Sequence, residues 1–193
     1  MPENREILNV VTAVSRPANL ATIQQHLIER LPSFDVRWHC VADINKCRLR
    51  PGGLECHFWG ESPVADRAGG AQKNLALGEI ASGWVYFLDD DNTIHPRFDA
   101  ALQEEIKLHP DAMGFVFGQA SASGQTLRVA AARNVKMGAI DIGQLILRRI
   151  AIDAHRFLLD VRASDWHLFE KVWGMHRERI HFSSVATYYN RLR

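Results

Sequence analysis

Trp84-Val85-Tyr86-Phe87-Leu88-Asp89-Asp90-Asp91-Asn92 is the stretch of sequence that decides the fold. Its first five residues are apolar, include aromatic and β-branched side chains, and directly follow Ser82-Gly83. A run of this kind, bounded by glycine on one side and by acids on the other, is typical of a buried β-strand. Three consecutive carboxylates come next and repel one another, so a cation, hydrogen bonds or solvent must offset their charge.

Strands and helices alternate along the chain around this strand. Residues 7–14 and 36–41 predict two more strands, and an amphipathic helix over residues 20–31 lies between them. The remaining patterns predict a short strand at 55–59, a helix at 71–81, a helix from about Pro96, strands at 113–117 and 145–147, a hairpin or loop at 124–135, a helix at 164–173 and an extended segment at 180–189. This order predicts a single α/β domain over residues 1–193, with a mostly parallel central sheet flanked by helices.

The composition excludes several classes of protein. The 193 residues are 47% hydrophobic and 23% charged, as in ordinary water-soluble globular proteins. The formal net charge of +1 argues against nucleic acid as a partner. Every apolar run is too short to cross a bilayer, and the N-terminus has no signal-peptide pattern. The three cysteines are an odd number, which argues against a disulfide framework, so we expect a cytoplasmic protein.

Acidic residues follow two of the predicted strands. Asp43 ends the second strand, and residues 89–91 follow the strand quoted above. Ligands of parallel sheets bind beyond the carboxyl ends of the strands, so we expect these acids to be neighbours in one site. Alternation along an extended chain would point Asp89 and Asp91 to the same side, where they would suit a divalent cation, Mg²⁺ or Mn²⁺. The alternative is a solvated acidic loop that caps the helix near Pro96.

Three separate segments, in this order, resemble the donor-binding core of the GT-A glycosyltransferases. They are Val11-Thr12-Ala13-Val14-Ser15-Arg16-Pro17, Ala71-Gln72-Lys73-Asn74-Leu75-Ala76-Leu77 and Val85-Tyr86-Phe87-Leu88-Asp89-Asp90-Asp91-Asn92-Thr93. The resemblance covers residues 1–110 and is closest to the inverting β-1,3-glucuronyltransferases, while glycosyltransferases of family 2 share a looser version. It implies a metal-dependent, inverting enzyme that moves a sugar from a nucleoside-diphosphate sugar, expected to be a UDP-sugar, to an acceptor hydroxyl.

The same resemblance implies a metal site. Asp91, the last acid of the DxD-type motif, would bind the Mn²⁺ or Mg²⁺ ion that bridges the donor diphosphate. Asp89 would contact the ribose or the sugar, or hold the metal through water, and Asp90 would belong to the donor-binding residues. Many such enzymes take a third ligand from the C-terminal region, often a histidine, which makes His181 a candidate. The alternative for His181 is a hydrogen-bonded packing role.

Nucleotide contacts are implied for three further residues of the first half. Asp43 matches an acid that contacts the uracil ring, and Arg16 lies in the turn near the nucleotide. Lys73 stands where the family has arginine, so it keeps the positive charge but loses the bidentate fork. Its alternative is an ordinary solvated position on a helix.

The second half, residues 111–193, is expected to hold the acceptor and the catalytic base. An inverting transfer needs a carboxylate that accepts the proton of the attacking hydroxyl. Asp165, in Ser164-Asp165-Trp166, resembles the acid that carries this role in family 2-like enzymes, with Glu170 a weaker candidate. The alternative for Asp165 is a helix cap. Asp141 is a candidate for a contact to the donor sugar, or else part of an ordinary loop.

Two other functions remain open at this point. The second half is short for an acceptor site, which favours a nucleotide-sugar-binding module without turnover, unless a homodimer supplies the missing wall. A sugar-phosphate nucleotidyltransferase has a related sheet. Such enzymes carry a glycine-rich basic loop after the first strand, whereas this chain has Ser15-Arg16-Pro17.

Overall fold

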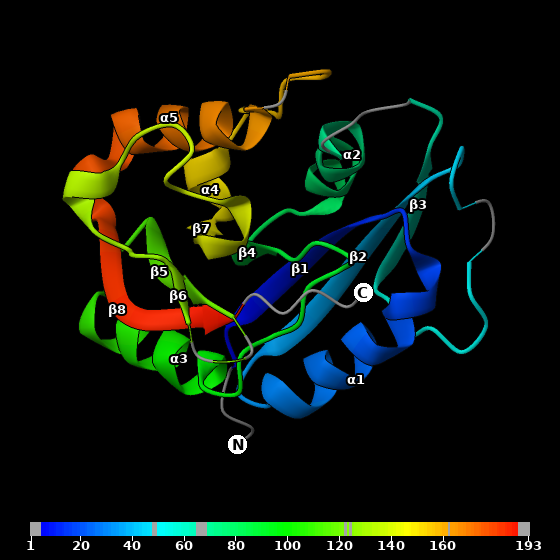
Figure 1. Ribbon diagram of the computed structural model, residues 1–193, viewed down its shortest axis with the longest axis horizontal. Coiled ribbons are helices and arrows are strands. Elements are labelled where there is room, and N and C mark those ends of the chain that lie inside the picture. Colours follow the sequence, from blue (N-terminus) through cyan, green and yellow to red (C-terminus); the bar gives the residue numbers. More distant parts are fainter. Residues whose placement is uncertain are drawn as a thin grey trace.

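One sheet organises the molecule (Figure 1). The computed structural model describes residues 5–47, 50–64, 69–121, 123, 125–161 and 163–188. Within these residues, eight strands form a mixed sheet in the order β3-β2-β1-β4-β7-β5-β6, and β8 pairs with β5. The predicted α/β class, with a central sheet flanked by helices, is confirmed. In the same residues, no helix is long and apolar enough to cross a membrane.

The first four strands are parallel and build the half of the sheet that follows the sequence prediction. They are β1 (Ile7–Val14), β2 (Asp35–Asp43), β3 (Phe58–Ser62) and β4 (Trp84–Phe87). β1 pairs with both β2 and β4, and β2 pairs with β3. The third strand begins three residues later than the predicted 55–59. Because all four run the same way, their carboxyl ends meet at one edge of the sheet.

The later strands set which residues reach that edge. They are β5 (Gly114–Ala120), β6 (Thr126–Arg128), β7 (Leu145–Arg148) and β8 (Ile180–Tyr188). β7 is antiparallel to both β4 and β5, and β8 is parallel to β5. β6 pairs antiparallel with the end of β5, so the segment at 124–135 includes a hairpin strand. It follows that β7 starts at the edge where β4 ends, while β8 starts at the opposite edge.

Helices cover both faces of the sheet (Figure 1). The helices are α1 (Leu20–Arg30), α2 (Gly70–Glu79), α3 (Phe98–Leu108), α4 (Arg149–Ile152) and α5 (Ser164–His176), with short 3₁₀ turns η1 (Pro17–Asn19), η2 (Ala132–Asn134), η3 (Ile142–Gln144) and η4 (Arg177–Arg179). α1 and α3 pack on one face, and α2, α4 and α5 pack on the other, over two separate apolar cores.

The central strand β4 contributes to both cores. Trp84 and Tyr86 belong to the core under α1 and α3, and Val85 and Phe87 belong to the core on the α2 side. All four side chains are at most 2% exposed. A strand covered by helices on both faces must be apolar on both, which explains the continuous apolar run in the sequence.

Candidate functional site

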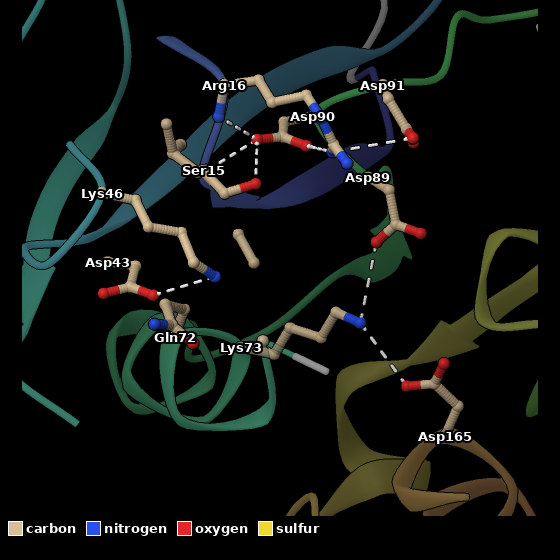
Figure 2. Close-up of a pocket in the computed structure, with 13 residues that line it drawn as sticks. Ser15, Arg16, Asp43, Lys46, Gln72, Lys73, Asp89, Asp90, Asp91 and Asp165 are labelled. Atoms are coloured by element: carbon tan, nitrogen blue, oxygen red, sulfur yellow. Dashed lines mark hydrogen bonds and ion pairs between the residues drawn. The ribbon is translucent and has the colours of Figure 1, made fainter. Parts of the chain in front are cut away.

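A pocket of about 370 Å³ opens at the carboxyl edge of β1, β2 and β4 (Figure 2). It is lined by Ala13, Val14, Ser15, Arg16, Asp43, Lys46, Gly69, Gln72, Lys73, Asp89, Asp90, Asp91 and Asp165. The structure therefore brings together the sequence-predicted site residues of the donor half and Asp165 of the second half. His181 is not among the lining residues.

Asp90 holds the turn that follows β1. Its Oδ2 accepts the backbone N–H groups of Ser15 and Arg16, each at 2.5 Å, and the Ser15 hydroxyl at 3.0 Å. Its Oδ1 accepts Nη1 of Arg16 at 2.8 Å, and its own backbone carbonyl accepts Nδ2 of Asn19. The side chain is only 4% exposed. Asp90 thus shapes the pocket wall, and its oxygens are already used within the protein.

Asp89 and Asp91 face different cations, because the chain turns between them. Asn92 donates its backbone N–H to the carbonyl of Asp89, which closes a turn at Asp90 and Asp91. Asp91 lies 3.6 Å from Nη1 of Arg16, whereas Asp89 lies 3.7 Å from Nζ of Lys73 (Figure 2). The extended geometry expected for these residues is therefore wrong, although both acids line the same pocket. None of the three acids caps α3, whose first turn has no side-chain cap.

Asp89 lies at the junction of the two halves of the pocket. Burial raises the pKa of its carboxyl group to about 6, against the opposing effect of the Lys73 ammonium. The carboxylates of Asp141, Asp165 and Asp91 raise it further. The side chain is still 38% exposed, so it lies open to the pocket while enclosed by other acids. Asp89 is therefore an acid whose ionised form gains from added positive charge.

Lys73 is the buried cation of the site, and its solvated alternative is wrong. The side chain is 3% exposed, and its ammonium lies 3.4 Å from Oδ1 of Asp165 and 3.7 Å from Oδ1 of Asp89. Burial alone would lower the pKa of this ammonium, but the charges of Asp89, Asp165 and Asp141 outweigh burial and raise the pKa. Lys73 is therefore held charged between a strand end and α5.

Asp165 approaches this group from α5. It lies in the first turn of that helix, and its side chain is 31% exposed in the pocket. The N-cap position of this helix is Ala163, and no side-chain hydrogen bond caps the helix there. The carboxylate faces Lys73, as Figure 2 shows. The predicted alternative of a capping role is therefore not what the structure shows.

Asp43 and Lys46 form the opposite end of the pocket. Oδ1 of Asp43 accepts the backbone and side-chain N–H groups of Asn45, and Oδ2 lies 3.2 Å from Nζ of Lys46. Burial would raise the pKa of Asp43, but these hydrogen bonds and the lysine charge outweigh it, so the pKa is lowered. Lys46 is 53% exposed. This end of the pocket therefore presents a carboxylate and an exposed lysine ammonium side by side.

Gln72 and Lys46 are site residues that the sequence reasoning missed. Gln72 is 2% exposed, and its Oε1 has no hydrogen-bond partner among the described residues although it lines the pocket. A buried carbonyl oxygen without a donor is costly, so a ligand donor here would be favourable. The sequence holds a signal for Gln72, because this residue directly precedes Lys73. It holds none for Lys46, because Lys46 lies in a loop with several other cations that look equally suitable.

Asp141 is a further acid that lies beside the pocket, before β7. Asp141 caps η3 by accepting the N–H of Gly143 at 3.0 Å, and the amide of Gln119 donates to the same oxygen at 3.2 Å. Arg128 lies 3.5 Å from its Oδ2. Asp141 also raises the pKa values of Lys73 and Asp89, so its charge is felt in the pocket.

The expectation that His181 completes a metal site needs correction. His181 is the second residue of β8 and pairs with Phe115 near the start of β5, at the edge of the sheet opposite the pocket. Its ring stacks on that of His109 at 3.7 Å, and burial together with His109 lowers its pKa. The packing alternative describes this residue, because β8 runs parallel to β5 and reaches the site edge only at its far end.

The pocket lining fits a divalent cation in the chemistry of its donors and in its charge. The lining includes five carboxylates and three cationic side chains, which leaves two formal negative charges. Hard oxygen donors are the ligands that Mg²⁺ and Mn²⁺ prefer. Among the described residues, no three acidic, histidine or cysteine side chains converge as a preformed metal site. Within the residues that the structure describes, Asp89 and Asp91 each have one ion pair, and both pairs are long, at 3.7 and 3.6 Å.

Solved structures to which this chain is similar include glycosyltransferases. The chain is similar to S. aureus TarS 1–349 in complex with UDP-GlcNAc, with a TM-score of 0.72 and 13% identity over 97% of this chain and 59% of that one. The chain has the GT-A glycosyltransferase fold. This confirms the fold that the resemblance implied.

Two other structures show how broad this fold is. The mannosyltransferase PcManGT from Pyrobaculum calidifontis, in complex with GDP-Man and Mn²⁺, matches with a TM-score of 0.63 and 16% identity over 97% of this chain and 57% of that one. Glucosyl-3-phosphoglycerate synthase from Mycobacterium tuberculosis, with Mg²⁺ and UDP, matches with a TM-score of 0.63 and 14% identity over 98% and 73%. This chain spans about 60% of the TarS 1–349 structures it matches. No protein-family model and no curated protein sequence matches it.

Proposed function

We propose that this protein is a metal-dependent, inverting glycosyltransferase that transfers a sugar from a UDP-sugar to an acceptor hydroxyl. The observation that carries the proposal is the pocket itself, where Asp43, residues 89–91, Lys73 and Asp165 converge at the carboxyl edge of a GT-A sheet. The three similar structures bind UDP-GlcNAc, GDP-Man with Mn²⁺, and UDP with Mg²⁺. These complexes support a nucleotide-sugar donor.

Charge is the argument for metal dependence. The pocket lining has two formal negative charges in excess, and a nucleoside-diphosphate sugar brings further negative charge. The two would repel each other at close range unless a cation accompanies the donor. Asp91 would hold that ion, with Asp89 nearby, and Mn²⁺ or Mg²⁺ would supply charge stabilisation for the departing diphosphate.

The nucleotide would occupy the end of the pocket formed by the loops after β1 and β2. Asp43 can accept an N–H from the uracil ring, and the adjacent Lys46 can donate to a ring carbonyl. Arg16 is held by Asp90 at the neighbouring wall, with its side chain 55% exposed, where it can approach phosphate oxygens. A donor in this orientation points its sugar toward Lys73 and Asp165.

Asp165 is the proposed general base. The acceptor hydroxyl attacks the anomeric carbon on the face opposite the diphosphate, the new C–O bond forms and the bond to the diphosphate oxygen breaks. The hydroxyl proton passes to the Asp165 carboxylate, and the bonding electrons leave with the nucleoside diphosphate. The side chain is partly exposed in the pocket, so an acceptor can reach it.

Isothermal titration with UDP and MnCl₂ tests the donor and metal parts of the proposal. We expect binding that requires Mn²⁺ and that weakens at least about tenfold in Asp91→Ala, because the ion loses its main ligand. Asp35→Ala is the matched control, since Asp35 is an exposed acid paired with Arg37 outside the pocket. UDP binding that ignores Mn²⁺, or that is equal in wild type and Asp91→Ala, would refute the proposal.

A binding module without turnover is the second candidate. In its favour, the pocket lining would hold a nucleotide sugar equally well with or without turnover. Incubation with Mn²⁺ and a panel of UDP- and GDP-sugars separates the two. Release of nucleoside diphosphate that is lost in Asp165→Asn supports the enzyme, whereas tight UDP binding without any release across the panel supports the module.

A further inference from the structure

Lys73 joins the two halves of the proposed active site through one buried ammonium group. Its Nζ lies 3.7 Å from Asp89 in the donor half and 3.4 Å from Asp165 on α5, with only 3% of the side chain exposed (Figure 2). We propose that Lys73 is a positioning residue that holds Asp165 in the orientation needed for proton transfer, rather than a ligand of the donor. This inference rests on the proposed role of Asp165 as the base.

The neighbouring residues fix Lys73 in place. Asn74, the next residue on α2, clasps the backbone of Phe157 by donating to its carbonyl at 2.9 Å and accepting its N–H at 2.8 Å. The ring of Phe157 lies 5.3 Å from the Lys73 ammonium and packs edge-on against Phe87 at the end of β4. The segment that leads to α5 is therefore attached to α2 immediately beside Lys73.

These contacts give Lys73 a task different from that of a donor ligand. The Lys73 ammonium lies within 4 Å of two carboxylates, those of Asp89 and Asp165. To reach a diphosphate it would have to leave both of them, and partly buried carboxylates without a partner are unfavourable. By staying, it binds Oδ1 of Asp165 and directs the other carboxylate oxygen to the acceptor hydroxyl. A base that is fixed in this way avoids the loss of rate that follows from a misplaced reacting group.

Lys46 provides the internal comparison. It is also a lysine of the pocket that pairs with a buried aspartate, Asp43, at 3.2 Å. Its side chain is 53% exposed, however, and it contacts the end of the pocket far from Asp165. Removing the charge of Lys46 changes the net charge of the pocket as much as removing that of Lys73, but leaves the contact to Asp165 intact.

A double-mutant cycle on the transfer reaction tests the inference. Lys73→Met should lower kcat about 100-fold in the presence of Asp165, with KM for the donor changed less than about threefold. In an Asp165→Asn background, the same substitution should change the residual kcat less than about threefold, because the group it positions is gone. Lys73→Arg should recover at least about tenfold of the lost kcat. Lys46→Met, at the nucleotide end of the pocket, should instead raise KM for the donor, and its effect on kcat should be the same in the wild-type and Asp165→Asn backgrounds.

The opposite pattern would overturn the inference. If Lys73→Met slows transfer equally in both backgrounds, or raises KM for the donor while kcat is kept, then Lys73 acts on the donor and not through Asp165. A dependence on the Asp165 background as large for Lys46→Met as for Lys73→Met would show that only the net charge of the pocket matters.

A thermal unfolding cycle distinguishes failure of this inference from failure of the proposed function. If Lys73 holds Asp165, Lys73→Met should lower the melting temperature by about 5 °C or more in wild type and by clearly less in Asp165→Asn. This measurement needs no turnover, so it decides the contact even if no donor is used. Equal shifts in both backgrounds would refute the link, whereas absence of transfer by wild type together with unequal shifts would refute only the proposed reaction.

Discussion

His39 is a buried histidine that should make the stability of this protein depend on pH. It lies in β2 with 1% of its surface exposed, and its Nε2 is 3.1 Å from Oδ1 of Asn9. The amide nitrogen of Asn9 donates to the carbonyls of Ser82 and Trp84, so its oxygen faces the ring and Nε2 must carry the hydrogen. Nδ1 is buried and has no partner in the described part of the chain. A second proton on this ring would therefore be an unpaired buried charge.

The size and sign of the effect follow from the pKa of this ring. Burial, with smaller effects of His57 and Arg37, lowers the pKa from 6.5 to about 4. The unfolded chain binds a proton at about pH 6.5, whereas the folded protein binds it only near pH 4, so acid favours unfolding. The stabilisation is complete above pH 6.5 and is lost as the pH falls to about 4, by about 3 kcal/mol at 1.36 kcal/mol per pH unit.

Urea unfolding of wild type and of His39→Gln, followed by tryptophan fluorescence from pH 7.5 to 4, measures this loss. Glutamine can still donate to Asn9 but does not titrate in this range. Between pH 7.5 and 4, the free energy of unfolding should fall by about 3 kcal/mol more in wild type than in His39→Gln. Carboxylates and the other histidines contribute equally to both proteins. Parallel profiles would show that His39 accepts a proton in the folded protein as readily as in the unfolded chain.

Three further predictions concern the pocket wall, a tight turn and a thiol. Asp90→Ala should reduce the free energy of unfolding by about 2–4 kcal/mol in urea, because two backbone N–H groups of the β1 turn lose their acceptor. Gly83→Ala should cost about 2 kcal/mol or more in the same assay, since Gly83 has φ +90° and an added Cβ would lie 2.8 Å from the carbonyl oxygen of Ile7. A hydrogen bond from Cys40 lowers the pKa of the Cys56 thiol to about 7, so its alkylation by iodoacetamide should reach half its maximal rate near pH 7. A midpoint near pH 9 would contradict that assignment.

The first half of the fold, with its four parallel strands, could be predicted from sequence because its signals are local. β1 covers the predicted residues 7–14, and β4 lies within the predicted apolar run, since buried parallel strands must be apolar on both faces. The prediction of a third strand at 55–59 is three residues too early at its start, because pairing with residues 39–43 of β2 selects Phe58–Ser62. Register of this kind depends on the partner strand and is not written in the segment itself.

The candidate site was predictable where it depends on strand ends and less so where it depends on side-chain partners. Asp43 and residues 89–91 meet in the pocket because parallel strands end at a common edge. Lys73 is buried against Asp165, a residue 92 positions later in the chain, and no periodic pattern in the sequence indicates this contact. His181 was misplaced for a topological reason, since a residue at the start of β8 lies at the wrong edge of the sheet.

One turn reduces the repulsion among the three consecutive acids, because it directs each carboxylate to a different environment. Asp90 turns inward, where backbone N–H groups and Arg16 surround its oxygens, and it is only 4% exposed. Asp89 and Asp91 are thereby separated, one to Lys73 at 3.7 Å and the other to Arg16 at 3.6 Å. Arg16 is itself bound more closely by Asp90, at 2.8 Å, so it neutralises Asp91 only in part. Lys73 likewise lies closer to Asp165, at 3.4 Å, and neutralises Asp89 only in part. The proposed metal site therefore depends on Asp89 and Asp91 and not on Asp90, whose oxygens are already used within the protein.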